Sequence, residues 1–138
     1  MTKEEEMQKY MMLIEQYKEQ LSSLDVQFSY LQNAIMDQTR AKTTLEHLDK
    51  TEAGVDVMIP IGGGAFIDAT AKKTSKALFD IGDGVVIEKT TKDIVNKMDE
   101  RIKNLQQTEE KISSMAQQVQ TEINEITDKA QKLMSEKG

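Results

Sequence analysis

The stretch of sequence that decides the fold runs from residue 54 to residue 88 and reads GVDVMIPIGGGAFIDATAKKTSKALFDIGDGVVIE. In its first part every second residue is a branched apolar one, namely Val55, Val57, Ile59 and Ile61. This period of two is typical of a half-buried strand. Gly62–Gly64 follows as a turn, and residues 65–70 supply a return strand. We therefore predict a β-hairpin here.

The same order repeats after a polar link over residues 71–76. Residues 77–81 form a second short apolar run, Gly82-Asp83-Gly84 is a turn signal, and residues 85–88 return. Isolated hairpins are marginal in water, and four short strands leave open edges. Because the long helices on either side use their apolar faces against each other, we predict that the hairpins pair with strands of other chains.

The glycine run invites a nucleotide-binding interpretation, which its surroundings do not favour. A Walker A loop needs Lys and Ser or Thr after its last glycine, and a dinucleotide fingerprint needs spaced glycines that open a helix. Gly62–Gly64 leads into another strand instead. Pro60 cannot donate to a ladder, so its position predicts an open edge or a strand end. A hairpin turn is the plain interpretation.

A long helical pattern precedes the hairpins, from residue 3 to about residue 52, where Gly54 is placed to end it. Apolar residues follow a 3-4 spacing, which predicts a left-handed coiled coil. The a positions are Met7, Ile14, Leu21, Phe28, Ile35 and Lys42, and the d positions are Tyr10, Tyr17, Leu24, Leu31, Gln38 and Leu45. Only Lys42 and Gln38 interrupt this row of a and d positions, which we call the seam.

A second helical pattern follows over residues 90–136, opened by Thr90 and Asp93 at the spacing of a capping box. Its a positions are Val95, Ile102, Glu109, Ala116, Ile123 and Ala130, and its d positions are Met98, Leu105, Ile112, Val119, Ile126 and Leu133. The hairpins return the chain to its starting end, so we predict an antiparallel two-helix coiled coil. Parallel self-dimerisation of each helix is an alternative, although it would separate the hairpins from a simple closed sheet.

The amino-acid composition favours an elongated helical protein and excludes several kinds of binding site. Charged residues make up 30% of the 138 residues and aromatic residues 4%, which suits long packed helices better than a compact globule. A net charge of −6 argues against a nucleic-acid binder, and Lys72, Lys73 and Lys76 are more simply a solvated link. There are no cysteines, which excludes disulfides and thiolate metal sites. We expect no signal peptide, no membrane span and a cytoplasmic protein.

No group of residues suggests catalysis, a metal site or a cofactor site. The single histidine, His47, falls at an outward f position without a second ligand. The chain ends instead carry more apolar residues than one seam can use: Met7, Tyr10, Met11, Met12, Leu13, Ile14, Leu133 and Met134. Methionine is common on surfaces that accept many partners, so these ends suggest a binding surface. Frayed termini with incidental apolar residues are the other interpretation.

The order helix, two hairpins, helix, with the runs VMIPIGGGAFIDA and LFDIGDGVVIEKT, resembles the α-type subunits of the prefoldin family over essentially the whole chain. The hairpin pair is the specific part of the resemblance, since β-type subunits have one hairpin. The chain lacks added tails, which suggests the archaeal form. The resemblance implies an α+β fold in one domain over 1–138, with helices at 3–52 and 90–136 and two hairpins at 54–88.

The resemblance also implies a function, an assembly and partners. Two α-type and four β-type subunits would form an α2β4 hexamer whose hairpins build a β-barrel platform. This chaperone would hold unfolded proteins at the free helix ends without ATP and deliver them to a group II chaperonin. Assembly residues would be Val57, Ile59, Ile61, Phe66, Ile67, Leu78, Phe79, Ile81, Val85 and Ile87. Client-contact residues would be Met7, Tyr10, Met11, Ile14, Leu133 and Met134.

Two other classes of function are alternatives to a chaperone subunit. An oligomeric coiled-coil scaffold or tether shares the same skeleton and differs only in lacking client binding at the helix ends. An enzyme has no nucleophile–base pair, metal cluster or phosphate loop to support it. The expectation is therefore a chaperone subunit that is not an enzyme, has no cofactor, and binds neither nucleic acid nor membrane.

Overall fold

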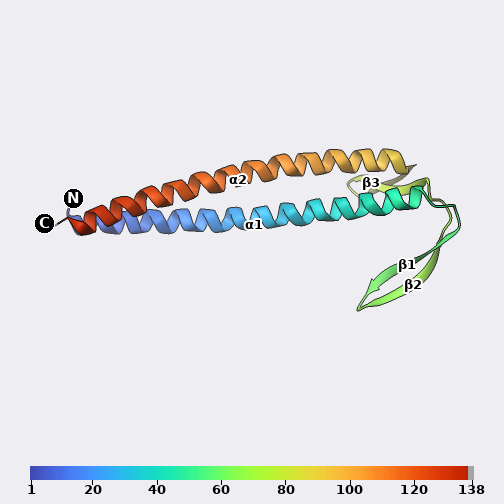
Figure 1. Cartoon of the computed structure of the whole chain (residues 1–138), viewed down its shortest axis with the longest axis horizontal. Helices are drawn as coiled ribbons and strands as arrows, with labels where there is room; N and C mark the ends of the chain where they lie inside the picture. Colours follow the sequence, from blue (N-terminus) through green and yellow to red (C-terminus); the bar gives the residue numbers. More distant parts are fainter. Residues whose placement is uncertain (137–138) are drawn as a thin grey trace. The chain divides into compact units, whose positions relative to one another are not determined.

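The structure is a computed structural model that describes residues 1–136. Its elements follow in the order α1 (Lys3–Asp49), β1 (Val55–Gly62), β2 (Ala65–Ala71), β3 (Lys76–Gly82), β4 (Val85–Thr90) and α2 (Thr91–Ser135) (Figure 1). The strands pair as two antiparallel two-stranded sheets, β1 with β2 and β3 with β4. The predicted order of two long helices around two hairpins is confirmed.

The chain divides into two compact units. One contains residues 1–34 of α1 together with α2 from residue 105 onward; the other contains residues 35–104, which include both hairpins. The expectation of a single domain over 1–138 stays a prediction.

In the first unit the two helices run antiparallel. Leu24, Leu31 and Ile112 form its buried core, and Phe28 and Ala116 pack against them. Toward the chain ends, Lys3 Nζ donates a hydrogen bond to the carbonyl oxygen of Glu136. The start of α1 therefore lies beside the residue that follows α2, as the predicted antiparallel pairing requires.

The second unit repeats the antiparallel pairing and adds a hairpin to it. Lys42 Nζ on α1 lies 2.7 Å from Asp99 Oδ1 on α2. The core here consists of Phe79 from β3 with Ile94 and Met98 from α2, and Ala41 and Leu45 of α1 pack against it. One strand thus contributes to the packing of the helices.

Every predicted a and d position is buried or half-buried, so the predicted heptad register is confirmed for both helices. The buried face is wider than the predicted seam. Ile94, which precedes the predicted a residue Val95, is only 1% exposed, whereas Val95 is half-buried. The reason is that Phe79 covers Ile94, a contact that helix periodicity does not contain.

The helix boundaries are set by local hydrogen bonds. Asp93 N donates to Thr90 Oγ1 at 3.2 Å, which is the predicted N-cap of α2. The prediction that α1 continues to residue 52 and ends at Gly54 is wrong, since the helix ends at Asp49. Thr51 N and Thr51 Oγ1 both donate to the carbonyl oxygen of Leu48, at 3.0 and 2.7 Å, and close the last turn early.

Both hairpins use the same turn. The two loop residues have positive φ in each: 60° and 79° at Gly63-Gly64, and 52° and 75° at Asp83-Gly84. Positive φ at both positions is the type I′ pattern, whose twist matches that of the flanking strands. The pairing register shifts just before each loop, between Pro60 and Gly62 and between Asp80 and Gly82. The glycine run is therefore a hairpin turn, and Pro60 lies near its strand end, as predicted.

Candidate functional sites: hairpin faces and helix ends

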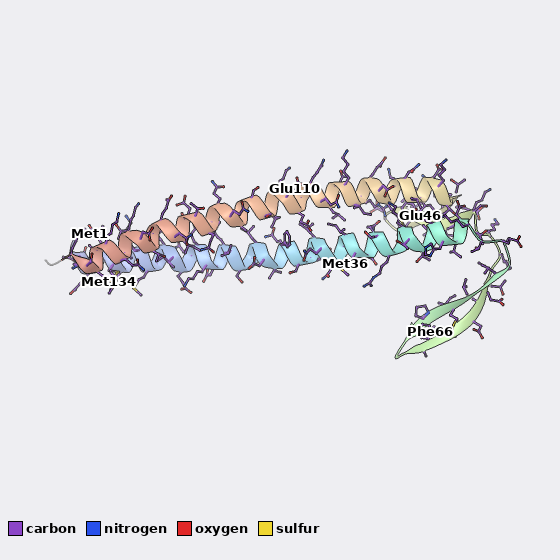
Figure 2. The ribbon with its side chains drawn as sticks, in the orientation of Figure 1. Met1, Met36, Glu46, Phe66, Glu110 and Met134 are labelled. Atoms are coloured by element: carbon purple, nitrogen blue, oxygen red, sulfur yellow. The ribbon has the colours of Figure 1, made fainter. Side chains whose placement is uncertain are left out.

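The first hairpin (β1 and β2) exposes apolar side chains that no other part of the described residues covers. Its register pairs Val57 with Ala69 and Ile59 with Ile67, so one face consists of small and branched apolar residues. Every residue of β1 and β2 is exposed or half-buried. The exposed large ones are Met58, Ile59, Ile61, Phe66 and Ile67. Phe66, near the turn of this hairpin, is labelled in Figure 2.

The second hairpin (β3 and β4) has two different faces. Phe79 pairs with Ile87 and Ala77 with Lys89, and this face meets the helices, where Phe79 is 7% exposed. Leu78 is 72% exposed on the opposite face, where Val86 is exposed as well. Fully burying one such aliphatic side chain stabilises an assembly by about 1.5–3 kcal/mol. Because Leu78 and Val86 are exposed, this outward face is the one available to another chain.

The predicted assembly residues fall into three groups. Ile59, Ile61, Phe66, Ile67, Leu78, Ile81 and Val85 are exposed. Val57 and Ile87 are half-buried within their hairpins. Phe79 is different, because it is buried in its own chain and is not free to contact another chain directly. Residues 78 and 79 point to opposite faces of a strand, so the period of two already separates them.

The helix ends carry exposed methionines beside a closed seam. Met11 and Met134 are 62% and 72% exposed, whereas Met7, Tyr10 and Ile14 are half-buried. Met134 is labelled in Figure 2 at the end of the first unit where Met1 also lies. Leu133 is only 9% exposed, in agreement with its predicted d position. Leu133 therefore lies in the seam and is not exposed in this conformation.

Comparisons with known proteins agree with this arrangement. The sequence profile of the family described as Prefoldin subunit matches residues 17–136. The chain belongs to the prefoldin family. The family is one of chaperone subunits, and within it the chain is similar to archaeal proteins named Prefoldin subunit alpha.

Two of those relatives illustrate the likeness. The one from Archaeoglobus fulgidus is 29% identical over 126 residues, which cover 91% of this chain and 92% of the relative. The one from Methanoregula boonei is 31% identical over 113 residues, covering 82% and 73%. A cryo-EM structure of filamentous PFD from Methanocaldococcus jannaschii superimposes with a TM-score of 0.73 at 18% identity, covering 84% of this chain and 96% of that chain. This last likeness shows that the fold is shared.

Three threonines of this prefoldin subunit join the helices to the link between the hairpins. Thr74 Oγ1 donates to the carbonyl oxygen of Thr51 at 3.0 Å, and Thr91 Oγ1 donates to that of Thr74 at 3.2 Å. Thr91 N also donates to the carbonyl oxygen of Ser75 at 2.9 Å. Thr74 and Thr91 are buried. These bonds satisfy buried polar groups where the three segments meet, and no sequence pattern singled them out.

The first unit also contains an apolar groove that the sequence analysis did not predict. Its walls are Val26, Gln27, Tyr30, Leu31, Thr108 and Ile112, and its volume is about 330 Å³. Val26 and Tyr30 are strongly exposed, four residues apart on α1. Two apolar residues four apart share one helix face. On a face of α1 that is otherwise polar, this spacing could have predicted the groove.

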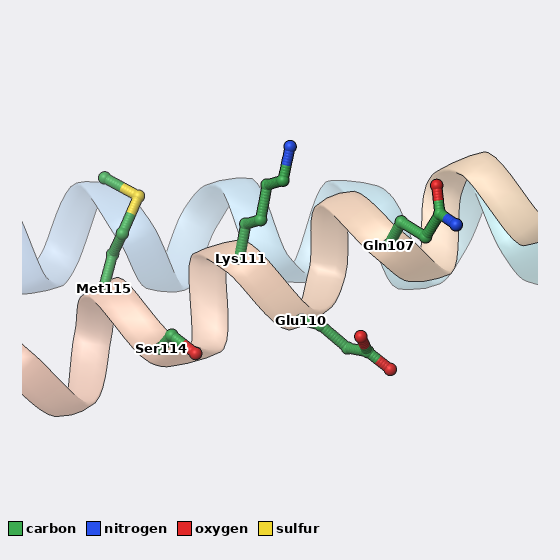
Figure 3. A pocket seen from close by; sticks show the side chains of 5 residues that line it. All are labelled: Gln107, Glu110, Lys111, Ser114 and Met115. Atoms are coloured by element: carbon green, nitrogen blue, oxygen red, sulfur yellow. The ribbon is translucent and has the colours of Figure 1, made fainter.

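A second hollow, of about 560 Å³, is lined by Gln107, Glu110, Lys111, Ser114 and Met115, all of α2 (Figure 3). In Figure 3 these side chains spread outward from a single helix and do not converge on one point. Such an arrangement has no position where a substrate would meet several polar groups.

Electrostatic interactions are local. Lys73 Nζ lies 3.0 Å from Glu88 Oε2, and the hydrogen bond from Lys73, followed by its charge, lowers the pKa of Glu88. The hydrogen bond to Asp99 raises the pKa of Lys42. Among residues 1–136, no group of three His, Cys, Asp or Glu side chains has the geometry to hold a metal ion. Within the same residues, no helix has an apolar stretch suited to crossing a bilayer.

Proposed function

We propose that this prefoldin subunit assembles through its hairpins with β-type subunits into an α2β4 hexamer. In this proposal the hexamer holds unfolded proteins at the helix ends without ATP and delivers them to a group II chaperonin in the cytoplasm. The observation that carries the proposal is the set of exposed apolar side chains on the two hairpins. Client capture and delivery come from the likeness to prefoldin α-type subunits.

The hairpin faces support assembly on energetic grounds. A monomeric protein does not usually leave this many large apolar side chains together in water. Each two-stranded sheet also has unpaired edges, which can accept a strand from another chain. The proposed contact residues are the exposed members of the predicted set, with Met58 and Val86 added. Phe79 supports the second hairpin from behind.

The helix ends support client binding through their methionines. A non-native chain offers varied apolar side chains, and flexible, polarizable Met adapts to them. We assign the first contacts to Met11, Met12 and Met134, which are exposed. Met7, Tyr10, Ile14 and Leu133 then form the wall behind them and become accessible where the helices fray.

Activity without nucleotide fits the chemistry of the chain. The glycines that could suggest a phosphate loop have positive φ and join β1 to β2. We accordingly propose a binding protein, not an enzyme, that needs no cofactor and binds neither nucleic acid nor membrane.

A scaffold or tether without client binding is the second candidate. Two observations favour it: Lys3 Nζ donates a hydrogen bond to the Glu136 carbonyl oxygen, and Leu133 is buried, so the helix ends are closed and not open. The two candidates agree on assembly and differ only at the methionines.

The experiment that separates them is light scattering of a denatured test protein diluted into buffer without nucleotide. This chain, co-expressed with a β-type subunit, is added as a hexamer whose mass is checked by sedimentation. The chaperone proposal predicts that aggregation is suppressed. A hexamer that leaves aggregation unchanged would support the scaffold.

The helix-end assignment is tested with Met11→Ser, Met12→Ser and Met134→Ser combined. Losing three exposed methionines should weaken client binding about tenfold or more while the hexamer persists. Met36→Ser, which changes an exposed methionine elsewhere on α1, is the control and should behave as wild type. Full suppression by the triple variant would refute the assignment.

A further inference from the structure

Arg101 on α2 contacts the second hairpin in two ways. Its guanidinium carbon lies 4.6 Å from the centroid of the Phe79 ring. Its Nη2 donates a hydrogen bond to the carbonyl oxygen of Asp80 at 3.3 Å. Asp80 Oδ1 in turn accepts a hydrogen bond from Gly82 N at 2.8 Å, next to the turn. One side chain of the helix thus holds both a ring and the backbone of β3.

The second hairpin is held to its own chain at other places as well. Phe79 packs on Ile94 and Met98 beneath the guanidinium. At the base of the hairpin, the hydrogen bonds of Thr74 and Thr91 tie the preceding link to Thr51, which follows α1, and to the first residue of α2. The middle, the turn side and the base of this hairpin therefore all have contacts within the same chain.

The first hairpin differs along its strands and at its turn, although the bond from Thr74 to Thr51 also lies at its base. All residues of its two strands are exposed or half-buried, including Ile59 and Phe66. The side-chain hydrogen bond from Thr70 Oγ1 to Asp56 Oδ1, at 3.5 Å, joins its strands to each other. A hairpin alone is marginally stable in water, so its position has to come from something that packs on it.

We propose that the two hairpins have unequal parts in assembly and that Arg101 is the positioning residue that makes them unequal. Arg101 fixes the second hairpin on its own helices before a partner subunit arrives, so that Leu78 and Val86 are already presented. The first hairpin takes its position only against the partner. This inference rests on the proposed function, because it presumes association with other prefoldin subunits.

The chemistry of arginine suits this role better than that of lysine. A planar guanidinium can lie over an aromatic ring and donate a hydrogen bond from its edge at the same time. A lysine ammonium in its place would keep the charge over the ring without the fork of donors. A surface fixed in advance also loses less conformational freedom on binding, which raises affinity without new contacts.

Hydrogen–deuterium exchange of the full-length chain, followed by mass spectrometry, tests the inequality. In the unassembled chain, amides of residues 76–90 should exchange about tenfold more slowly than those of residues 55–71. After assembly with a β-type subunit, residues 55–71 should gain the larger protection. Equal protection of both hairpins in the unassembled chain would overturn the inference.

Arg101→Gln tests the positioning residue, with Arg40→Gln as the matched control. Arg40 is the other arginine of the chain and is exposed on α1. Arg101→Gln should speed exchange over residues 76–90 about tenfold, leave residues 55–71 unchanged and weaken association by a similar factor. The exchange rate over residues 76–90 in Arg101→Lys should fall between those of wild type and Arg101→Gln. Arg40→Gln should exchange like wild type.

The outcomes separate this inference from the proposed function. If wild type assembles and Arg101→Gln exchanges like wild type over residues 76–90, the inference fails and the function stands. Faster exchange of both hairpins and both helices alike would mean general destabilisation and would also refute the positioning role. If wild type never assembles with a β-type subunit, the proposed function fails, and the inference fails with it.

Discussion

At the residue scale, the polar side chains of the seam are satisfied to different degrees. Lys42 has an ion pair with Asp99 at 2.7 Å, and this bond raises the pKa of Lys42. The stability that Lys42 gains from this bond is therefore present at neutral pH and is lost as pH rises through that raised pKa. Gln38 Oε1, by contrast, is buried and has no hydrogen-bond partner within the described residues. Polar seam residues thus contribute unequally to stability.

Gln38→Leu should stabilise the chain by about 1 kcal/mol, because it removes an unsatisfied acceptor and supplies the apolar group that a d position favours. The measurement is the midpoint of thermal unfolding by circular dichroism, which should rise by a few degrees. Gln32→Leu, at an exposed position six residues earlier on α1, is the control and should give no gain. A lower midpoint for Gln38→Leu would show that the amide has a structural role.

Lys73→Gln should raise the pKa of Glu88 toward its ordinary value near 4.5, because the hydrogen bond and charge that lower it are removed. Since the folded-state pKa is the lower one, the ion pair adds stability above the ordinary value and loses it as pH falls through the folded value. An NMR titration of the Glu88 carboxyl carbon measures this shift. Lys72→Gln is the control, and the same Glu88 titration in both variants would contradict the account.

At the scale of elements, the hairpins depend on turns whose backbone is left-handed. Adding a Cβ at Gly84 would meet no atom within 4 Å, so crowding is not the reason for glycine there. Its φ of 75° is the reason, since residues with a side chain rarely adopt it. The turn sequence therefore fixes the register of the second hairpin.

Gly84→Ala should destabilise the second hairpin by about 1 kcal/mol, because alanine carries a steric cost in the left-handed region. Asp83→Asn should be nearly neutral, since asparagine suits the first position of a type I′ turn. Exchange of the amides of residues 76–90 reports both changes. Wild-type exchange in Gly84→Ala would contradict the assigned turn.

Sequence alone predicted the features that depend on near neighbours in the chain. The heptad positions, the Thr90 cap and both glycine turns are of this kind. It did not show which face of the second hairpin meets the helices, so Phe79 and Leu78 were placed together. The burial of Ile94, the stacking of Arg101 and the threonine bonds come from contacts between distant segments, which periodicity does not encode.

For the candidate sites, too, the sequence predicted some residues correctly and not others. Exposure of Ile59, Phe66, Met11 and Met134 agrees with the predicted surfaces, because no other part of residues 1–136 covers them. Leu133 follows the heptad into the seam instead, since a d position is buried whenever its partner helix is present. The roles assigned to all these residues remain predictions.

At the scale of the whole molecule, the account separates assembly from binding. The hairpins, in one unit, would join this chain to other prefoldin subunits. The helix ends, in the other unit, would hold the client. A change in one unit should therefore leave the activity of the other measurable, which makes the central claim about the hairpins testable by itself.

The most direct test of that claim is sedimentation of Ile59→Asp co-expressed with a β-type subunit, beside Ile59→Val as the matched control. Ile59 is exposed in the unassembled chain, so the aspartate should leave its helical content intact. In a shared sheet it would bury an unpaired charge, which should weaken association about 100-fold or more. The account predicts helical, unassembled Ile59→Asp and hexameric Ile59→Val. Hexamers of normal size and stability from Ile59→Asp would contradict it.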